Sequence, residues 1–85
     1  HWMGIDVHDE SPYKYPNGEE IPLHKGMILT IEPGIYCDEN DKSIPRKYRG
    51  IGIRIEDDIL VTKDSNENLS YDIVKTIEDI EALSI

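Results

Sequence analysis

Three residues in this chain have side chains that could bind a metal ion together: His1, Glu32 and Glu56. Each lies in a run of residues that favour β-strands, and the set offers one imidazole and two carboxylates. Such a set suits first-row divalent ions, and a site rich in oxygen favours manganese or magnesium. A carboxylate that bridges two ions about 3.5–4 Å apart would form a two-metal hydrolase centre. Because three side chains cannot hold two ions securely, we expect at least two further ligands, as aspartates, before residue 1.

Each of these residues also has a plainer interpretation. Glu32 follows an apolar run, so it must be paired, hydrogen-bonded or bound to a cation if its strand is buried. If the strand ends earlier, Glu32 is simply solvated. Glu56 shares a strand face with Arg54 and Asp58, whose charges could compensate each other on a surface. A lone histidine is more often structural than a ligand, and the free amine of His1 could chelate a metal together with its ring.

Two strands must position the carboxylates. Residues 27–36 form the first strand, which is apolar on both faces near its start and therefore largely buried. Pro33 and Gly34 end its regular pairing. Residues 51–62 form the second strand, in which an isoleucine-rich face alternates with a polar face. Asp57 interrupts the apolar face and indicates a bulge. The polar face carries Gly52, Arg54, Glu56 and Asp58.

The rest of the chain is expected to consist of one further strand, loops and one helix. Residues 1–9 are expected to form a strand that bends near Gly4. Thr76 can cap a helix, with Asp79 in the acceptor position of a capping box. The loops are expected over residues 10–26, 37–50 and 63–70, where turn-forming residues gather.

Length and composition indicate part of a larger enzyme. Eighty-five residues make at most one small domain, which buries only about 60–65% of its unfolded surface. Hydrophobic residues are 38% of the chain and phenylalanine is absent, so the apolar faces should expect partners. An active site rarely begins at a terminus, and we therefore expect the chain to be the tail of a longer protein.

Charge and cysteine content exclude several classes. The net charge of −9 argues against nucleic acid, which needs a basic surface. The single cysteine, Cys37, excludes an internal disulfide and slightly favours a reducing compartment. No apolar run approaches the roughly 18–20 residues of a membrane span, so no membrane contact is expected.

Three segments of the chain resemble a known family. His1-Trp2-Met3-Gly4-Ile5-Asp6-Val7-His8-Asp9, then residues 26–36 and residues 48–58, resemble in this order the C-terminal third of the catalytic domain of the Xaa-Pro aminopeptidase (aminopeptidase P) family. The resemblance covers nearly the whole chain. It implies an α+β "pita-bread" fold with antiparallel strands and a closing C-terminal helix, shared with prolidase, methionine aminopeptidase and creatinase. Residues 1–85 would be the C-terminal portion of that domain.

The resemblance also implies a role for each candidate residue. The family's binuclear site uses two aspartates, one histidine and two glutamates, usually with two manganese ions (zinc or cobalt as alternatives). His1 would be the histidine ligand, and Glu32 and Glu56 the glutamate ligands, with Glu56 bridging the ions. Glu32 would also be the general base. His8 would contact the substrate and either shuttle a proton or stabilise the tetrahedral intermediate, and Arg54 would orient a metal-binding carboxylate.

The activity implied is hydrolysis of the peptide bond that precedes a proline in second position, by a metal-activated hydroxide. Both aspartate ligands, an upstream substrate-binding histidine and the N-terminal domain are missing, so the fragment alone should be inactive. The partners implied are the peptide substrate, the remainder of the catalytic domain and a second copy of the full-length protein. The compartment implied is cytoplasmic, or alternatively mitochondrial. Prolidase and a non-catalytic homologue that serves as a binding module remain alternatives.

Overall fold

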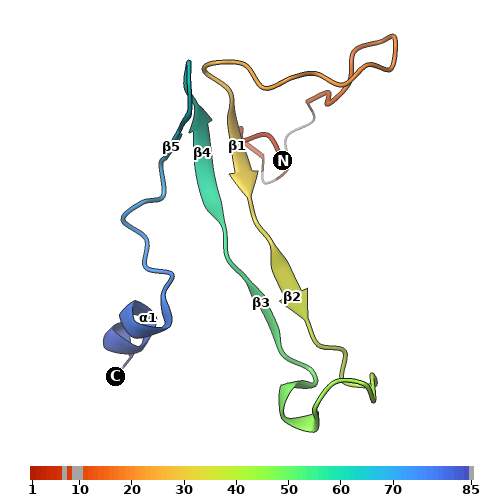
Figure 1. Cartoon of the computed structure of the whole chain (residues 1–85), viewed down its shortest axis with the longest axis vertical. Coiled ribbons are helices and arrows are strands. Elements are labelled where there is room, and N and C mark those ends of the chain that lie inside the picture. Colours follow the sequence, from red (N-terminus) through yellow and green to blue (C-terminus); the bar gives the residue numbers. More distant parts are fainter. Residues whose placement is uncertain (7, 9–10, 85) are drawn as a thin grey trace.

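A long two-stranded ribbon dominates the computed structural model, which describes residues 1–6, 8 and 11–84 (Figure 1). Its strands are short and form two sheets, ordered β1-β4-β5 and β2-β3, in which all neighbours are antiparallel. The elements are β1 (Ile28–Ile31), β2 (Gly34–Tyr36), the 3-10 helix η1 (Arg46–Tyr48), β3 (Gly52–Arg54), β4 (Asp57–Val61), β5 (Asn66–Asn68) and α1 (Ile77–Leu83).

The two sheets keep one register along the ribbon. The β1–β4 pairing ends with Ile31 opposite Asp57, and the β2–β3 pairing begins with Gly34 opposite Arg54. Two residues separate these pairs on each side, so neither strand contains an extra residue. The bulge expected at Asp57 is therefore wrong. Each expected long strand is instead divided into two short ones, at the place where Pro33 lacks the N–H needed for ladder pairing.

The side chains alternate across this ribbon, as the sequence predicted. One face carries the chemically active side chains, and the opposite face is rich in isoleucine. Contacts among the polar side chains join residues of β1, β2 and β3 to Glu32, which lies between β1 and β2. The polar face therefore collects Thr30, Glu32, Tyr36, Arg54, Glu56 and Asp58.

The N-terminal segment lies against the free edge of β1 rather than forming a strand. Trp2 and Leu29 form an isolated bridge, and the Thr30 amide donates to the His1 carbonyl at 2.8 Å. Bends follow over residues 4–6. The strand expected over residues 1–9 is therefore wrong for the described residues, while residues 7 and 9 lie outside them. The contact with β1 places His1 beside the polar face.

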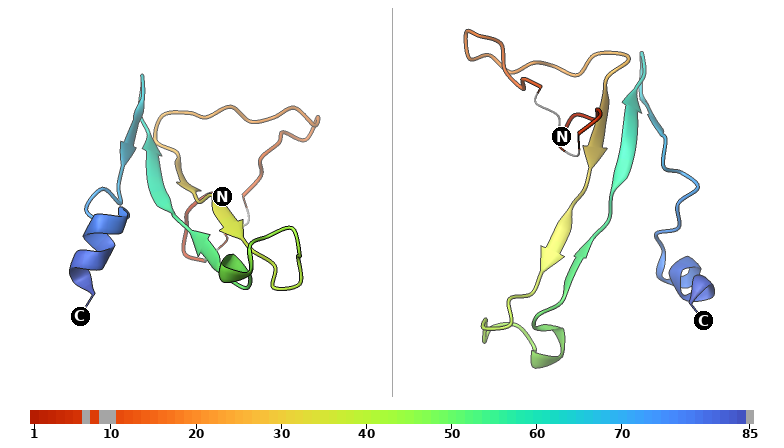
Figure 2. Two further views of the ribbon diagram at one scale, coloured as in Figure 1. Left: turned by 60° about the horizontal axis from the view of Figure 1, so that its bottom comes forward. Right: turned by 180° about the vertical axis from the view of Figure 1, so that it is seen from behind.

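The connecting segments agree in part with expectation. Residues 11–26 form the expected loop, with one isolated bridge between Lys14 and Glu20. The sequence did not predict η1 or β5. The helix is confirmed, because the Thr76 hydroxyl accepts a hydrogen bond from the Asp79 amide at 3.1 Å. Figures 1 and 2 show α1 and the loop of residues 11–26 projecting away from opposite sides of the ribbon.

The described chain has no hydrophobic core of its own. No hydrophobic residue among those described is buried, and Thr30 and Ser70 are the buried polar residues. The radius of gyration is 17.4 Å, whereas a compact domain of this length would have about 12 Å. Within the described residues, no helix combines the length and the apolar character that crossing a membrane requires. The ribbon thus presents apolar faces that need covering.

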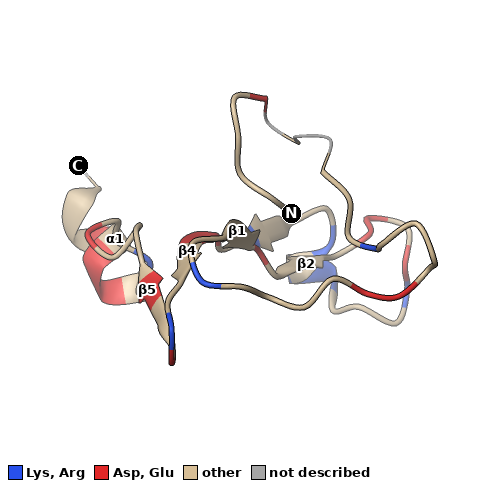
Figure 3. Ribbon diagram, turned by 90° about the horizontal axis from the view of Figure 1, so that it is seen from above, with Lys and Arg blue, Asp and Glu red and all other residues tan. Residues whose placement is uncertain are grey.

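Acidic side chains are spread over the molecule rather than confined to the site. Figure 3 shows them on α1, along the β4–β5 side and in the loops, with basic residues between them. Glu78 and Asp79 lie in the first turn of α1, where negative charge is favourable to the helix dipole. The carboxylates of the polar face must therefore be judged by their local geometry and not by net charge.

Candidate metal centre

An open pocket of about 360 Å³ lies between the N-terminal segment and the polar face of the ribbon. Four of the five residues singled out in the sequence line it, although they come from segments far apart in the chain. Arg54, the fifth, lies beside the pocket against Glu32. The pocket-lining residues with polar side chains include His1, His8, Thr30, Glu32, Glu56 and Asp58.

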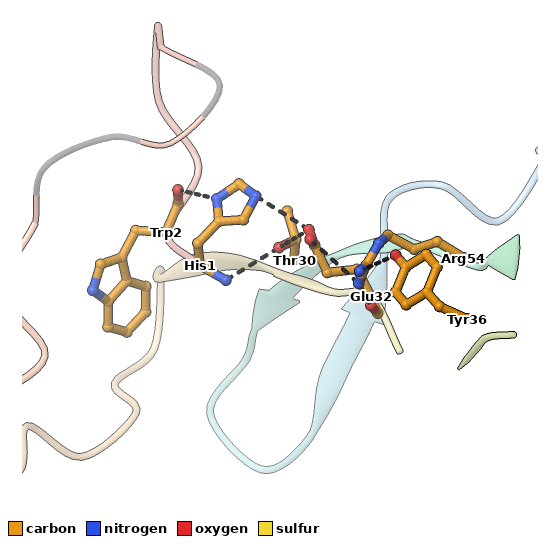
Figure 4. Close-up of polar contacts among 6 residues, drawn as sticks. All are labelled: His1, Trp2, Thr30, Glu32, Tyr36 and Arg54. Atoms are coloured by element: carbon orange, nitrogen blue, oxygen red, sulfur yellow. Dashed lines mark hydrogen bonds and ion pairs between the residues drawn. The ribbon is translucent and has the colours of Figure 1, made fainter. Parts of the chain in front are cut away.

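The ring of His1 is oriented by its neighbours (Figure 4). Its Nδ1 lies 2.9 Å from the Trp2 carbonyl oxygen. A carbonyl can only accept, so Nδ1 carries the proton and donates it. Nε2 then points at Glu32 Oε2, 3.2 Å away. Two groups that both offer lone pairs need a proton or a cation between them, and metal-binding histidines are commonly oriented in this way.

His8 completes a group of three possible ligands. The His1 and His8 rings lie edge to face with their centroids 4.6 Å apart. One ligand atom from each of His1, His8 and Glu32 lies within 4.8 Å of the other two, close enough to share one ion. The family resemblance implied a substrate role for His8 and not a ligand role. The position of His8 in the pocket is compatible with either role.

Glu32 and Glu56 lie opposite each other, because the register continues through the gap between the paired segments. Like charges directly opposite each other destabilise a sheet. The pKa of Glu56 is raised by desolvation and then by the neighbouring Glu32 charge. The pKa of Glu32 is lowered, chiefly by a hydrogen bond from Thr30 and also by Arg54. A divalent cation between the two carboxylates would relieve their repulsion, so the donor set fits a metal.

Thr30 is a site residue that sequence reasoning missed. Its hydroxyl donates to Glu32 Oε2 at 2.9 Å, and its main-chain amide donates to the His1 carbonyl at 2.8 Å. It is one of the few buried residues, at 6% exposure. The sequence feature that could have indicated Thr30 is its position two residues before Glu32, which puts both side chains on the same strand face. Thr30 therefore fixes the carboxylate relative to the histidine.

Tyr36 was also missed, and it holds Arg54 in place. The Arg54 guanidinium donates to the Tyr36 hydroxyl and to the Glu32 main-chain carbonyl, and lies 3.8 Å from Glu32 Oε1. Tyr36 lies over two glycines: a Cβ added at Gly52 would be 2.6 Å from its ring, and one at Gly34 would be 2.9 Å from its hydroxyl. The two glycines on the polar face were the available signal, since they leave room for a large side chain.

Residues 1–63 match the sequence model of Metallopeptidase family M24. The chain belongs to this family. Membership of this metallopeptidase family implies divalent metal ions, in agreement with the donor set of the pocket. The M24 match includes every residue of the candidate site.

The relatives most similar in sequence include proteins that are much longer than this chain. The chain is 51% identical to the Xaa-Pro aminopeptidase of Escherichia coli K12 over 85 residues, all of this chain and 19% of that protein. It is 49% identical to human Xaa-Pro aminopeptidase 3 over 83 residues, 98% of this chain and 16% of that protein. The chain therefore spans less than a fifth of these relatives.

Solved structures confirm the expected fold class. The aminopeptidase PepP of Pseudomonas aeruginosa has a TM-score of 0.85 at 46% identity, over 96% of this chain and 18% of that chain. Escherichia coli aminopeptidase P with the inhibitor Pro-Leu has a TM-score of 0.81 at 50% identity, with the same coverage. The M24 chain described here is thus an α+β piece of the pita-bread type, with antiparallel strands and a C-terminal helix.

Proposed function

We propose that these residues form part of the active site of a metal-dependent aminopeptidase that cleaves an N-terminal residue from proline. The observation that supports this is the convergence of His1, Glu32 and Glu56 on one pocket in an M24 chain. Relatives that share about half of its residues are named Xaa-Pro aminopeptidases. We assign this activity to a longer complete polypeptide, since the chain spans only 19% and 16% of the length of these relatives.

The metal would be held by His1, Glu32 and Glu56, with Glu56 shared between two ions. Manganese is the proposed metal, with zinc or cobalt as alternatives; a zinc-substituted form of the Escherichia coli enzyme has been solved. When bound, such ions polarise a substrate carbonyl and lower the pKa of water. Two aspartates from the remainder of the catalytic domain would complete the ligand set.

The protein side chains would handle the proton and the substrate. Glu32 is held by Thr30 and Arg54, so its carboxylate has a fixed direction in which to accept a proton from the attacking water. His8 lies on the same side of the pocket and would contact the substrate and stabilise developing charge. Arg54 would orient Glu32 without touching the reacting atoms.

The proposed partners follow from the same assignment. The substrate is a peptide with proline in second position, and the remainder of the catalytic domain covers the apolar faces of the ribbon. We further propose a homodimer of the full-length protein in the cytoplasm, or alternatively in mitochondria. The 85 residues alone would be inactive, because they provide only three of the five ligands.

The test uses the complete natural polypeptide that contains these residues. With Mn²⁺ it should release the N-terminal residue from an Xaa-Pro-Xaa tripeptide, and a chelator should abolish this activity. Glu32→Gln should lower kcat by roughly 10²–10⁴-fold, the range of a general base, with an unchanged thermal unfolding temperature. Glu39→Gln, an exposed glutamate in the distal loop, is the matched control.

Three results would change the assignment. Full activity of the Glu32→Gln variant would reject Glu32 as the base. Cleavage confined to Xaa-Pro dipeptides would assign prolidase instead. Complete absence of metal binding and hydrolysis by the unmodified protein would favour a non-catalytic binding module.

A further inference from the structure

The segment that follows β5 returns to the ribbon through Lys75. The Lys75 ammonium lies 2.8 Å from Asp57 Oδ1, and it donates to the carbonyls of Ser70 at 3.0 Å and Ile73 at 2.8 Å. An ammonium has three protons to donate, and here each has an acceptor. Exposed lysine pairs usually contribute little, but this lysine is 22% exposed and held from three sides. It therefore has a fixed position relative to β4.

The same segment also forms hydrogen bonds with the main chain of Asp58, the residue after Asp57. The Ser70 hydroxyl, on a residue only 7% exposed, accepts from the Asp58 amide at 3.0 Å. The Leu69 amide donates to the Asp58 carbonyl at 2.8 Å. The Asn68 side chain in turn accepts from the Ser70 amide at 2.8 Å. Both polar groups of the Asp58 main chain are thus satisfied by residues 69–70.

These contacts reach the first two residues of β4, directly after Glu56. Glu56 lies between β3 and β4 and belongs to neither strand. On its N-terminal side, Arg54 is fixed by the Tyr36 hydroxyl and the Glu32 carbonyl. On the C-terminal side of Glu56, Asp57 pairs with Ile31 at the end of the β1–β4 ladder. The ion pair to the Asp57 side chain and the hydrogen bonds to the Asp58 main chain come from residues 69–75.

We propose that Lys75 is a positioning residue for Glu56, acting through Asp57 from the opposite face of the sheet. Successive side chains point to opposite faces, so Asp57 faces away from the pocket while Glu56 and Asp58 line it. A displacement of Asp57 would change the position of Glu56, because the two residues are joined by a peptide bond. The inference rests on the proposed function, because it takes Glu56 as a metal ligand.

The test compares Lys75→Met with the unmodified complete polypeptide. Residues that orient metal ligands typically change metal affinity or activity about 10–100-fold when removed. We expect Mn²⁺ affinity, measured by the paramagnetic resonance of free Mn²⁺, to fall in that range, with KM for the tripeptide unchanged at saturating metal. Lys75→Arg should recover part of the loss. Lys63→Met, at an exposed lysine just after β4, should bind Mn²⁺ as the unmodified protein does.

A double-mutant cycle identifies the route. If Lys75 acts through Asp57, adding Lys75→Met to Asp57→Asn should cause little further loss of Mn²⁺ affinity. Full additivity would overturn the proposal, as would a folded Lys75→Met variant with unchanged Mn²⁺ affinity. If Lys75→Met does not fold, Asp57→Asn carries the test alone, and unchanged affinity there overturns the proposal. An unmodified protein that neither binds Mn²⁺ nor cleaves the peptide would instead overturn the proposed function.

Discussion

Glu32 is held from two directions, and this decides how its carboxylate can be used. Thr30 donates to Oε2, and Arg54 lies against Oε1 and the main-chain carbonyl. The lowered pKa, caused first by the Thr30 hydrogen bond, keeps the group ionised at neutral pH. A carboxylate that is both ionised and fixed in direction suits a ligand or a proton acceptor better than a mobile surface charge.

Tyr36 should matter for activity although it lies beyond the ligands. Tyr36→Phe removes the hydroxyl that accepts from Arg54, so the guanidinium loses one of its two anchors. We expect kcat of the complete polypeptide on an Xaa-Pro tripeptide to fall about 10–100-fold, with little change in the unfolding temperature. Tyr71→Phe, on a residue 81% exposed, is the control. Equal kcat values for the two variants would contradict this role.

A pH effect belongs to Asp41, far from the site. The Ser43 hydroxyl and amide donate to Asp41 Oδ1 at 2.6 and 2.9 Å and hold the pKa of Asp41 below its ordinary value. Since the folded pKa is depressed, the stabilisation is present above the unfolded pKa and is lost as pH falls through the folded pKa. Ser43→Ala should raise the Asp41 pKa in an NMR titration of the complete polypeptide, and Ser84→Ala should not.

At this scale, the sequence predicted candidate site residues from their side-chain types, and their roles stay a prediction. The structure brings His1, Glu32 and Glu56 to one pocket. Strand alternation accounts for the shared face of the two carboxylates, whereas the position of His1 depends on its contact with β1. Thr30 and Tyr36 could not be predicted, because their importance depends on a partner across the ribbon. A hydroxyl gives no sign in the sequence of which atom it will contact.

At the scale of elements, the strands show where local patterns are sufficient. The isoleucine alternation predicted the faces of residues 51–62 correctly. The polar sequence Asn66-Glu67-Asn68 gave no strand signal, and β5 exists through its pairing with β4. The strand expected at residues 1–9 was wrong because the backbone there follows the edge of β1, which is a tertiary contact.

The cap of α1 offers a test of local stability. Thr76→Ala removes the acceptor for the Asp79 amide, and loss of such a cap typically costs about 1 kcal/mol. We expect a lower free energy of unfolding for the complete polypeptide in urea, or earlier amide exchange confined to α1. Thr76→Ser keeps the acceptor and should behave as the unmodified protein. The same loss in both variants would argue against the cap.

At the scale of the whole molecule, the missing core is the dominant feature. No described hydrophobic residue is buried, and burial of apolar surface is the main force that offsets the loss of chain entropy. The low hydrophobic content and the absence of phenylalanine had indicated faces that need partners. Which element covers each face could not be predicted, because no pattern within these 85 residues identifies a partner for it.

The isolated 85 residues should therefore behave differently from the complete polypeptide. We expect no cooperative thermal transition in calorimetry, only weak Mn²⁺ binding and no cleavage of Xaa-Pro peptides. The complete polypeptide, measured in parallel, should show a cooperative thermal transition, tighter Mn²⁺ binding and cleavage of Xaa-Pro peptides. A sharp transition together with turnover by the 85-residue chain would show that the ribbon is self-sufficient.

The unbroken register between the paired strands has a consequence for how this site tolerates insertions and deletions. Glu32 meets Glu56 because each sits at a fixed step of the ladder, whatever the length of chain that joins them over residues 37–51. Lengthening that connection changes the entropy of loop closure only slowly. One residue inserted within either strand would turn a carboxylate to the isoleucine face. Length variation that preserves activity should thus collect at the tip of the hairpin and be absent from its arms.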